Sequence, residues 1–470
     1  MTDAPLILWL RRDLRLMDSP MLAEAARTGR PLIPLFILDP ETEALGAAPK
    51  WRLGLGIAEF AKTLATVGSQ LILRRGGALD VLRDVLAETG ANAVWWHRLY
   101  DPGSVARDTP VKSALKEQGV EARSFAGHLL FEPWEVETGT GGFYRVYTPF
   151  WKSVRDRPVS APLAAPMSLT APASWPKSDD LDGWQMGAAM RRGGDVVAAH
   201  VHVGESKALA RLDHFIGTSV DAYATDRDLP AVDGTSGLSE NLAYGEIGPR
   251  TIWAAGWRAM QAGAQGAETF LKELVWREFA YHLMHHTPHI THANWKPEWD
   301  DFPWQGDNKN AEYWRRGLTG EPFVDAAMRE MYVTGRMHNR ARMIVASYLT
   351  KHLMTHWRVG QDWFAECLVD WDPAANAMGW QWASGSGPDS APFFRIFNPA
   401  IQVEKFDPKA EYRHRFIAEL SRTPGPDAMS YFDAVPKSWA LDPSRPYPKP
   451  LVDLAEGRKL ALAAYAGRNS

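Results

Sequence analysis

The first part of the chain alternates short apolar runs with stretches whose apolar residues recur at helical spacing. The apolar runs cover residues 6–10, 32–38, 70–73, 93–97 and 122–125. Segments such as 51–67 and 78–88 separate them and carry an amphipathic helical pattern. Strands that alternate with helices in this way build a parallel, doubly wound sheet. We therefore predict an α/β domain with a five-stranded sheet, whose ligand site lies beyond the carboxyl ends of the strands.

The pattern changes twice after this region. Residues 131–203 are irregular and include a stretch rich in Pro, Ala and Ser at 157–177, which is typical of a long connection. From Gly204 onward strand signals are absent, and helical periodicity covers residues 206–215, 249–261, 267–284, 322–334 and 341–355. The sequence thus predicts an α/β domain at 1–130, an interdomain connection at 131–203 and a larger all-α domain at 204–470.

Composition and charge narrow the class of protein. Of 470 residues, 45% are hydrophobic and 23% are charged, an ordinary globular balance, and the net charge of −4 argues against a general polyanion binder. The single cysteine, Cys367, excludes an intramolecular disulfide, which fits a reducing compartment. No segment has the roughly 18 apolar residues that a membrane span requires. We expect a soluble, cytoplasmic protein.

Tryptophan is concentrated in one part of the chain. Twelve of the 21 tryptophans lie between Trp253 and Trp382. Tryptophan is bulky, is rarely fully buried and needs a partner for its N–H, so this density indicates a bound planar group; core packing alone is the alternative. No Gly-x-Gly-x-x-Gly motif follows the first apolar run, which argues against a nicotinamide site of the Rossmann type.

One predicted helix carries a mixed set of side chains. Trp276 and Arg277 follow Glu273 by three and four residues and therefore share one helix face with it. Such a carboxylate, indole and guanidinium could accept a hydrogen bond, stack on a base and hold a phosphate. The alternative is a Glu273–Arg277 ion pair beside a core tryptophan.

Two further segments have the composition of anion sites. Residues 335–342 bring three guanidiniums to the start of a helix, where phosphate is favoured. Residues 234–239, Gly-Thr-Ser-Gly-Leu-Ser, offer hydroxyls and backbone N–H groups just before another helix. For residues 335–342 the alternative is an exposed basic turn or ion pairs to Asp370 and Asp372. For residues 234–239 it is a Gly/Ser turn that caps the next helix.

Four histidines, at 282, 285, 286 and 289, form two i,i+4 pairs. This spacing can chelate a metal on one helix face. No third ligand lies within reach in the sequence, so we predict no metal site and expect the histidines to belong to a helix end near Pro288.

Several motifs occur in a fixed order along the chain. They are Trp9-Leu-Arg-Arg-Asp-Leu-Arg, Arg227-Asp-Leu-Pro-Ala, Gly234-Thr-Ser-Gly-Leu-Ser, Trp276-Arg-Glu-Phe, Met337-His-Asn-Arg-Ala-Arg-Met, Asp372-Pro-Ala-Ala-Asn, Gly379-Trp-Gln-Trp and Phe394-Arg-Ile-Phe-Asn-Pro. With them the chain resembles the photolyase/cryptochrome family over nearly its whole length. The resemblance implies an α/β antenna-type domain, an all-α FAD-binding catalytic domain and a DNA-facing cavity that leads to the flavin.

The resemblance also implies the residues that hold FAD. Those expected around its phosphates are Tyr223, Thr235, Ser236, Leu238 and Ser239. Those expected around the ribityl chain and the isoalloxazine are Asn339, Arg342, Asp370, Asp372 and Asn376. Asn376 would face N5 of the flavin, where an amide can hydrogen-bond either redox form, which favours repair over signalling.

Within the family the chain is most similar to bacterial cyclobutane pyrimidine dimer (CPD) photolyases. Met343 stands where (6-4) photolyases tend to carry histidine, so the expected substrate is the cyclobutane dimer in damaged DNA. The residues implied to contact the dimer are Glu273, Trp276, Met343 and Trp382. A non-repairing cryptochrome-like blue-light photoreceptor and a (6-4) photolyase are the alternatives.

Two further sets of residues follow from the resemblance. Arg227, Arg277, Arg340 and Arg395 are the implied contacts to DNA phosphates. Trp380, Trp357 and Trp304 match the family's electron-transfer chain, and core packing is their alternative role. A monomer is expected.

The chain departs from the family pattern at three places. Gly237 stands where arginine is frequent, and Ala377-Met378 stands where Asn-Gly is frequent. Residues 100–108 lack the Asn-Glu pair that holds the folate antenna in the best-known type. Methenyltetrahydrofolate, a deazaflavin, another flavin or no antenna at all therefore stay open as second chromophores.

Overall fold

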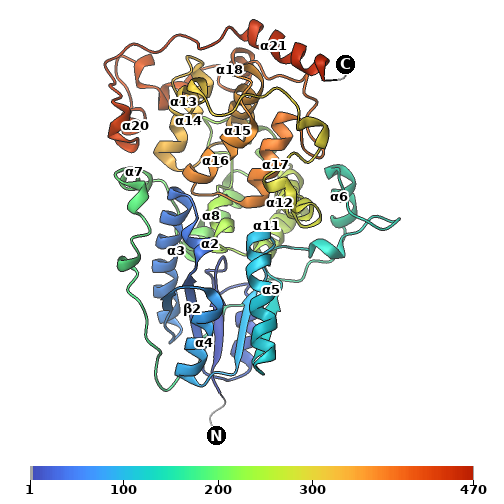
Figure 1. The fold of residues 1–470 in the computed structure, drawn as a ribbon, viewed down its shortest axis with the longest axis vertical. Helices are drawn as coiled ribbons and strands as arrows, with labels where there is room; N and C mark the ends of the chain where they lie inside the picture. The colour runs from blue at the N-terminus through green and yellow to red at the C-terminus, as the bar shows by residue number, and fades with distance from the viewer. Residues whose placement is uncertain (1–3, 469–470) are drawn as a thin grey trace.

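The computed structural model describes residues 4–468 and separates an α/β part from a helical part (Figure 1). The sheet consists of β1 (Leu6–Leu10), β2 (Leu32–Leu38), β3 (Ile72–Arg75), β4 (Ala93–His97) and β5 (Glu121–Phe125). All its strand pairs are parallel, in the order β3-β2-β1-β4-β5. The predicted five-stranded doubly wound sheet is confirmed.

The strands β1, β2 and β4 are fully buried and mostly apolar because both faces of the sheet are covered, whereas the edge strands β3 and β5 keep exposed polar residues. Leu6 and Leu8 point into one hydrophobic core, and Ile7 and Trp9 point into the other. The surrounding helices are α1 (Pro20–Arg27), α2 (Pro40–Glu43), α3 (Ala47–Thr66), α4 (Ala78–Thr89) and α5 (Pro102–Glu117). Strand β3 begins two residues later than predicted, so residues 70 and 71 precede it.

The connection after β5 has little regular structure. It contains η1 (Pro133–Glu135), α6 (Tyr147–Val154), η2 (Asp182–Trp184), η3 (Ala188–Met190) and α7 (Gly193–Val197). Between α6 and α7 the chain runs down one side of the α/β part (Figure 1), where Leu32 N donates to Thr170 O at 2.8 Å. The boundaries at 130 and 203 stay a prediction.

The rest of the described chain is helical, as predicted, and its β pairing is a single bridge between Gln305 and Thr355. The α-helices are α8 (Glu205–Thr218), α9 (Tyr223–Asp226), α10 (Ser239–Ala243), α11 (Pro249–Gln261), α12 (Ala267–His286), α13 (Lys309–Arg315), α14 (Pro322–Thr334), α15 (Asn339–Ser347), α16 (Trp357–Cys367), α17 (Pro373–Ser384), α18 (Pro399–Phe406), α19 (Glu411–Phe416), α20 (Pro426–Ala434) and α21 (Leu454–Gly467). Short turns are η4 (Pro288–Thr291), η5 (Pro297–Trp299), η7 (Ala418–Leu420) and η8 (Lys437–Trp439).

One predicted helix, over residues 341–355, is divided. Helix α15 ends at Ser347, and the chain widens into a π-helical turn, η6 (Tyr348–His352), in which every side chain is buried. Such π-turns are rare, and they occur mostly as single turns within α-helices, frequently at functional sites.

Buried polar contacts fix the α/β part against the helical part. Arg52 on α3 and Glu246 form an ion pair with N–O 2.6 Å, and both side chains are fully buried. The Tyr244 hydroxyl also reaches the α/β part, where it donates to Pro49 O of α3 at 3.2 Å. Within residues 4–468, no helix is long and apolar enough to cross a membrane.

Candidate functional site

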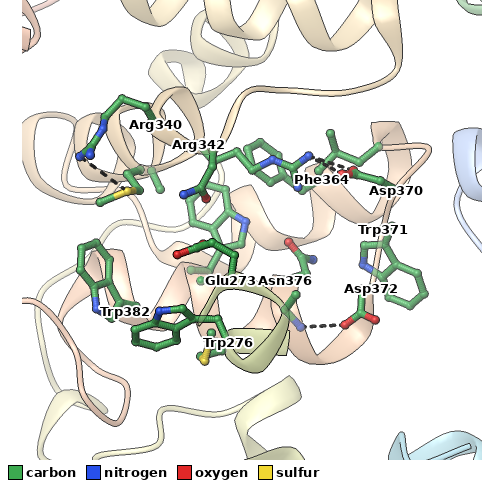
Figure 2. Close-up of a pocket in the computed structure, with 18 of the residues that line it drawn as sticks. Glu273, Trp276, Arg340, Arg342, Phe364, Asp370, Trp371, Asp372, Asn376 and Trp382 are labelled. Carbon is green, nitrogen blue, oxygen red and sulfur yellow. Dashed lines mark hydrogen bonds and ion pairs between the residues drawn. The ribbon is translucent and has the colours of Figure 1, made fainter. Parts of the chain in front are cut away.

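A cavity of about 390 Å³ opens between α12, α15 and α17, and Figure 2 shows most of its wall. Its lining includes every residue implied to contact the dimer, together with Asn376. The lining residues expected from the sequence are Arg227, Glu273, Trp276, Asn339, Arg340, Arg342, Met343, Asp370, Asp372, Asn376, Trp380 and Trp382. Residues that sequence reasoning missed are Ala346, Phe364, Leu368, Trp371, Ala375, Met378 and Gly379. Residues far apart in the sequence thus converge on one hollow.

Helix α17 supplies one wall of this cavity. Asp372 caps the helix by accepting from Ala374 N at 3.0 Å and Ala375 N at 2.9 Å, and Pro373 occupies the first turn. Asn376 donates its amide to Gln361 O on α16 at 3.1 Å. The cap and this hydrogen bond hold the Asn376 side chain at the cavity wall (Figure 2).

Helix α12 supplies the opposite wall. Trp276 stacks on Tyr147 of α6, with ring centroids 3.7 Å apart and planes 7° from parallel. Glu273 pairs with Arg227, the residue after α9. Arg277 donates instead to His128 O at 2.9 Å and does not line the cavity. The Glu273–Arg277 ion pair, which the sequence offered as an alternative, therefore does not form.

A second cavity, of about 600 Å³, lies beside the loop at 234–239. Its lining includes the residues expected at the FAD phosphates: Tyr223, Thr235, Ser236, Leu238 and Ser239. Arg211, which also lines this cavity, donates to Ser236 O at 2.8 Å and to Thr235 O at 3.0 Å and so holds the loop in place.

Gly237 explains one departure from the family pattern. Its φ is +62°, and a Cβ there would approach guanidinium atoms of Arg211 at 3.2 Å and Arg336 at 3.3 Å. These two arginines bring guanidinium groups beside the position where the family often has arginine. Arg211 is paired with Asp233 at 2.6 Å, so among the described residues Arg336 carries the uncompensated charge of the two. Sequence reasoning missed Arg211, because it lies on α8 and only the fold brings it to the loop.

Asn339, Arg342 and Asp370 line both cavities and join them. Arg342 Nη2 donates to both Asp370 oxygens, at 2.9 and 2.7 Å (Figure 2). Ser239 donates to Asp370 at 2.7 Å, so the carboxylate links the loop at 234–239 to α15. One of the two predicted alternatives for the arginine-rich segment, an ion pair to Asp370, therefore forms.

Several buried polar atoms at these cavities have no hydrogen-bond partner in the protein. They are Trp371 Nε1, Trp380 Nε1 and Arg340 Nε at the first cavity and His202 Nδ1 and His338 Nε2 at the second. Burial lowers the pKa of His338 to about 4, so its ring is neutral at pH 7. Buried polar groups are normally satisfied, so these atoms fit a polar ligand. A planar ring in the aromatic cavity and phosphates beside the loop match the shape and donors of FAD.

The three tryptophans of the predicted electron-transfer chain lie at different depths, from the first cavity to the surface. Trp380 lines the cavity and packs on Gly360 of α16, one turn after Trp357. The His356 ring lies 5.4 Å from the Trp357 ring and 5.3 Å from that of Trp304, which is partly exposed. The side chains are arranged for a route from cavity to surface; electron transfer along it stays a prediction.

One of the predicted DNA-phosphate contacts, Arg395, and the histidine cluster at 282–289 lie outside both cavities. Arg395 is exposed on the segment after α17, where its carbonyl accepts from Lys351 at 3.0 Å. His282 and His286 both approach Pro133 O at 3.2 Å, so they contact the connection. Among the described residues no group of three His, Cys, Asp or Glu could hold a metal.

Two family models match the chain. The model described as DNA photolyase matches residues 6–167, and that described as the FAD binding domain of DNA photolyase matches residues 270–467. The chain belongs to the DNA photolyase family. Its FAD-binding domain contains most of the lining of the first cavity.

Relatives match over nearly the full length. A deoxyribodipyrimidine photo-lyase of Agrobacterium fabrum is 44% identical, with 98% of each chain covered. Cryptochrome-2 of Arabidopsis thaliana is 33% identical over 98% of this chain and 79% of its own. The crystal structure of a bacterial class III photolyase from Agrobacterium tumefaciens superposes with a TM-score of 0.92 at 43% identity, covering 100% of this chain and 98% of that one.

The antenna of this photolyase family member stays open. An archaeal photolyase from Sulfolobus tokodaii, described with two FAD molecules, has a TM-score of 0.81 at 28% identity, covering 98% of this chain and 100% of that one. Here Arg107 pairs with Asp39 at 2.8 Å and with Asp108 at 2.8 Å, in the segment that lacks the Asn-Glu pair. These side chains therefore do not favour a folate antenna bound in the way that the Asn-Glu pair binds it.

Proposed function

We propose that this protein is a deoxyribodipyrimidine photolyase that splits cyclobutane pyrimidine dimers in DNA under light. One observation carries the proposal: Glu273, Trp276, Met343, Asn376 and Trp382 line a single cavity. That cavity shares its wall with the second one, which holds the hydroxyls and guanidiniums suited to FAD phosphates. The lesion and the cofactor would therefore meet across a short distance.

The lesion enters the cavity by leaving the duplex. A base within the stack cannot reach the cavity, and a damaged pair costs less to extrude, which gives part of the selectivity. Trp276 and Trp382 present ring faces and edges for stacking, while Glu273 accepts hydrogen bonds from pyrimidine imide N–H groups. Met343 supplies a polarisable apolar contact.

When bound in reduced form, FAD would supply the light-absorbing electron donor for splitting the dimer. The protein positions that donor and keeps water away. Arg342 and Asp370 hold the wall between the two cavities, and Asn376 presents its amide from α17. Asp372, as the α17 cap, fixes the helix that carries Asn376, Trp380 and Trp382.

The proposal assigns phosphate contacts to Arg227 and Arg340, which line the cavity, and to the exposed Arg395. Arg277 is left out, because its guanidinium donates to His128. Trp304, Trp357 and Trp380 are proposed to carry electrons inward when oxidised flavin must be reduced. Action as a cytoplasmic monomer is part of the proposal and is tested by sedimentation and fractionation.

The test is light-dependent repair of defined oligonucleotides that carry either a cyclobutane dimer or a (6-4) product, with reduced protein and dark controls. Dimer repair in light alone is expected. Repair of the (6-4) product alone would overturn the use of Met343. No repair with FAD bound would favour the photoreceptor alternative. The similarity to Cryptochrome-2 of Arabidopsis thaliana is the reason for testing this alternative.

A further inference from the structure

Two ion pairs lie at the first cavity, and they share a short stretch of chain at residues 227–228. Arg227 pairs with Glu273 of α12, and its chain neighbour Asp228 accepts from Arg340 Nη2 of α15 at 2.6 Å. The charges therefore alternate along the wall and cancel. Both arginines are proposed phosphate contacts, yet neither is a free cation in this structure.

The four side chains are accessible enough to exchange partners. Arg227 and Arg340 are each 19% exposed, Glu273 is 29% exposed and Asp228 is 36% exposed. Partly exposed pairs are weak and yield to competing charges.

The arginines also have supports that do not depend on the carboxylates. The Arg340 guanidinium lies 4.5 Å from the centroid of Phe406, and that of Arg227 lies 5.6 Å from the centroid of Tyr223. These ring contacts keep both cations at the cavity when a carboxylate leaves.

Resting on the photolyase function proposed above, we infer that Glu273 and Asp228 mask the two phosphate-binding arginines until a lesion arrives. A flipped dimer offers imide N–H donors that draw Glu273 away from Arg227. Because Arg227 and Asp228 are adjacent in the chain, movement of the first disturbs the pair between Asp228 and Arg340. Both cations then turn to backbone phosphates.

The exchange makes Asp228 a residue that determines specificity without touching the lesion. Undamaged DNA keeps its imide N–H groups in base pairs within the stack, so none reaches Glu273 and the DNA meets a wall whose charges cancel. Damaged DNA meets two unmasked guanidiniums. Recognition of the base and binding of the backbone are thereby coupled, and the coupling works in both directions.

Salt dependence measures this coupling, because each phosphate neutralised by a cation adds about 0.9 to the slope of log affinity against log salt. Binding of a duplex with one cyclobutane dimer, and of the same duplex without it, is measured by fluorescence anisotropy in the dark over a NaCl series. The wild-type slope is expected to be steeper for the damaged duplex by up to about 1.8, which is two such contacts.

Asp228→Asn unmasks Arg340 permanently. We expect affinity for undamaged DNA to rise about threefold to tenfold and its salt slope to steepen by about 0.9, with a smaller change for damaged DNA. Glu273→Gln should tighten binding of undamaged DNA in the same way, through Arg227. Asp213→Asn, at an exposed acid of α8, is the matched charge control and should change neither slope.

The double variant Asp228→Asn/Arg340→Gln must lose the gain, because the unmasked cation is then absent. Equal wild-type slopes for the two duplexes would overturn the inference. So would an Asp228→Asn variant that binds undamaged DNA no more tightly, or binds both duplexes more weakly, since Asp228 would then only position Arg340. The repair assay separates the two proposals. If the wild type repairs the dimer but Asp228→Asn binds DNA as the wild type does, only the exchange of ion pairs is wrong. If the wild type neither prefers damaged DNA nor repairs it, the proposed function is wrong.

Discussion

The two joined cavities differ in the chemistry of their walls. The first is lined by Trp276, Trp380, Trp382 and Phe364 and suits planar rings, whereas the second is lined by hydroxyls and arginines around the loop at 234–239 and suits phosphates. Asn339, Arg342 and Asp370 belong to both. The difference teaches that the site is bipartite: one half is built for aromatic contact and the other for charge. The partly buried ion pair between Arg342 and Asp370 joins them.

The largest effect is expected at the junction, from Asp370→Asn. This change removes the charge that pairs with Arg342 and weakens the contact to Ser239. Loss of one partner of such a pair costs about 3 kcal/mol, which corresponds to roughly a hundredfold weaker FAD binding. Fluorescence titration of the apoprotein with FAD measures it. Unchanged FAD affinity would show that the two halves do not depend on this pair; Asp407→Asn, at an acid outside both cavities, controls for the loss of charge.

Of the two halves, the phosphate half should show a pH effect, to which His338 contributes. His200 and His202 line the same cavity, and burial lowers their pKa values as well. Burial lowers the pKa of His338 to about 4, so the folded state binds fewer protons than the unfolded state between that pH and the ordinary value of 6.5. Stability from this group is therefore complete above pH 6.5 and falls by up to about 3 kcal/mol as the pH drops through this window. Urea unfolding at a series of pH values measures it.

Burial lowers the pKa of His282, His352 and His356 to about 4 as well, so only a variant isolates His338. His338 Nδ1 accepts from Arg340 N and caps α15. His338→Asn keeps a capping side chain and removes the titration. A variant whose pH profile runs parallel to that of the wild type would contradict the assignment.

Glu273→Ala should damage the aromatic half and spare the phosphate half. The loss of a charged hydrogen-bond acceptor is worth about 2 kcal/mol, so affinity for the dimer should fall roughly thirtyfold while FAD stays bound. Repair at limiting substrate and flavin absorbance are the two measurements. Unchanged repair with FAD retained would remove Glu273 from the lesion pocket; Glu268→Ala, at an exposed acid on the same helix, is the control.

The smallest effect on repair is expected from Trp304→Phe. The indole N–H donates to Thr350 O at 2.9 Å, so the change costs about 1 kcal/mol of stability. Photoreduction of oxidised flavin should slow strongly, because phenylalanine is harder to oxidise, whereas chemically reduced protein should repair normally. Loss of both activities would contradict the relay, and Trp299→Phe, at the indole stacked on Trp304, tests whether the route extends further.

Much of the fold could be predicted because its signals are local. Helices α11 and α14 match the predicted ranges, since Pro249 and Pro322 mark their starts and Gly335 ends α14 in a left-handed conformation. The sheet strands were recognisable because burial on both faces requires apolar runs. The sequence did not predict that the helix expected over residues 341–355 is interrupted by the π-turn η6, because this turn depends on the packing around it.

The candidate site was predictable as a set of residues and less so as an arrangement. The spacing predicted that Arg277 lies on the same helix face as Glu273. In the structure its guanidinium instead hydrogen-bonds His128 of the α/β part. Arg211 carried no signal, since nothing near it in the sequence marks a phosphate loop. Pairing between Asp228 and Arg340 joins positions more than 100 residues apart.

The sequence by itself determined the five-stranded sheet, the helical domain, the motif residues of the two cavities and the family to which they belong. Those properties depend on hydrophobic periodicity and on residue identity, which are written along the chain. Only the tertiary structure decided which carboxylate masks which arginine, that Arg211 and Arg336 flank Gly237, and that Asp370 joins the cavities. Ion pairs and hydrogen bonds act within about 3 Å, so their partners are fixed by where distant segments come to rest.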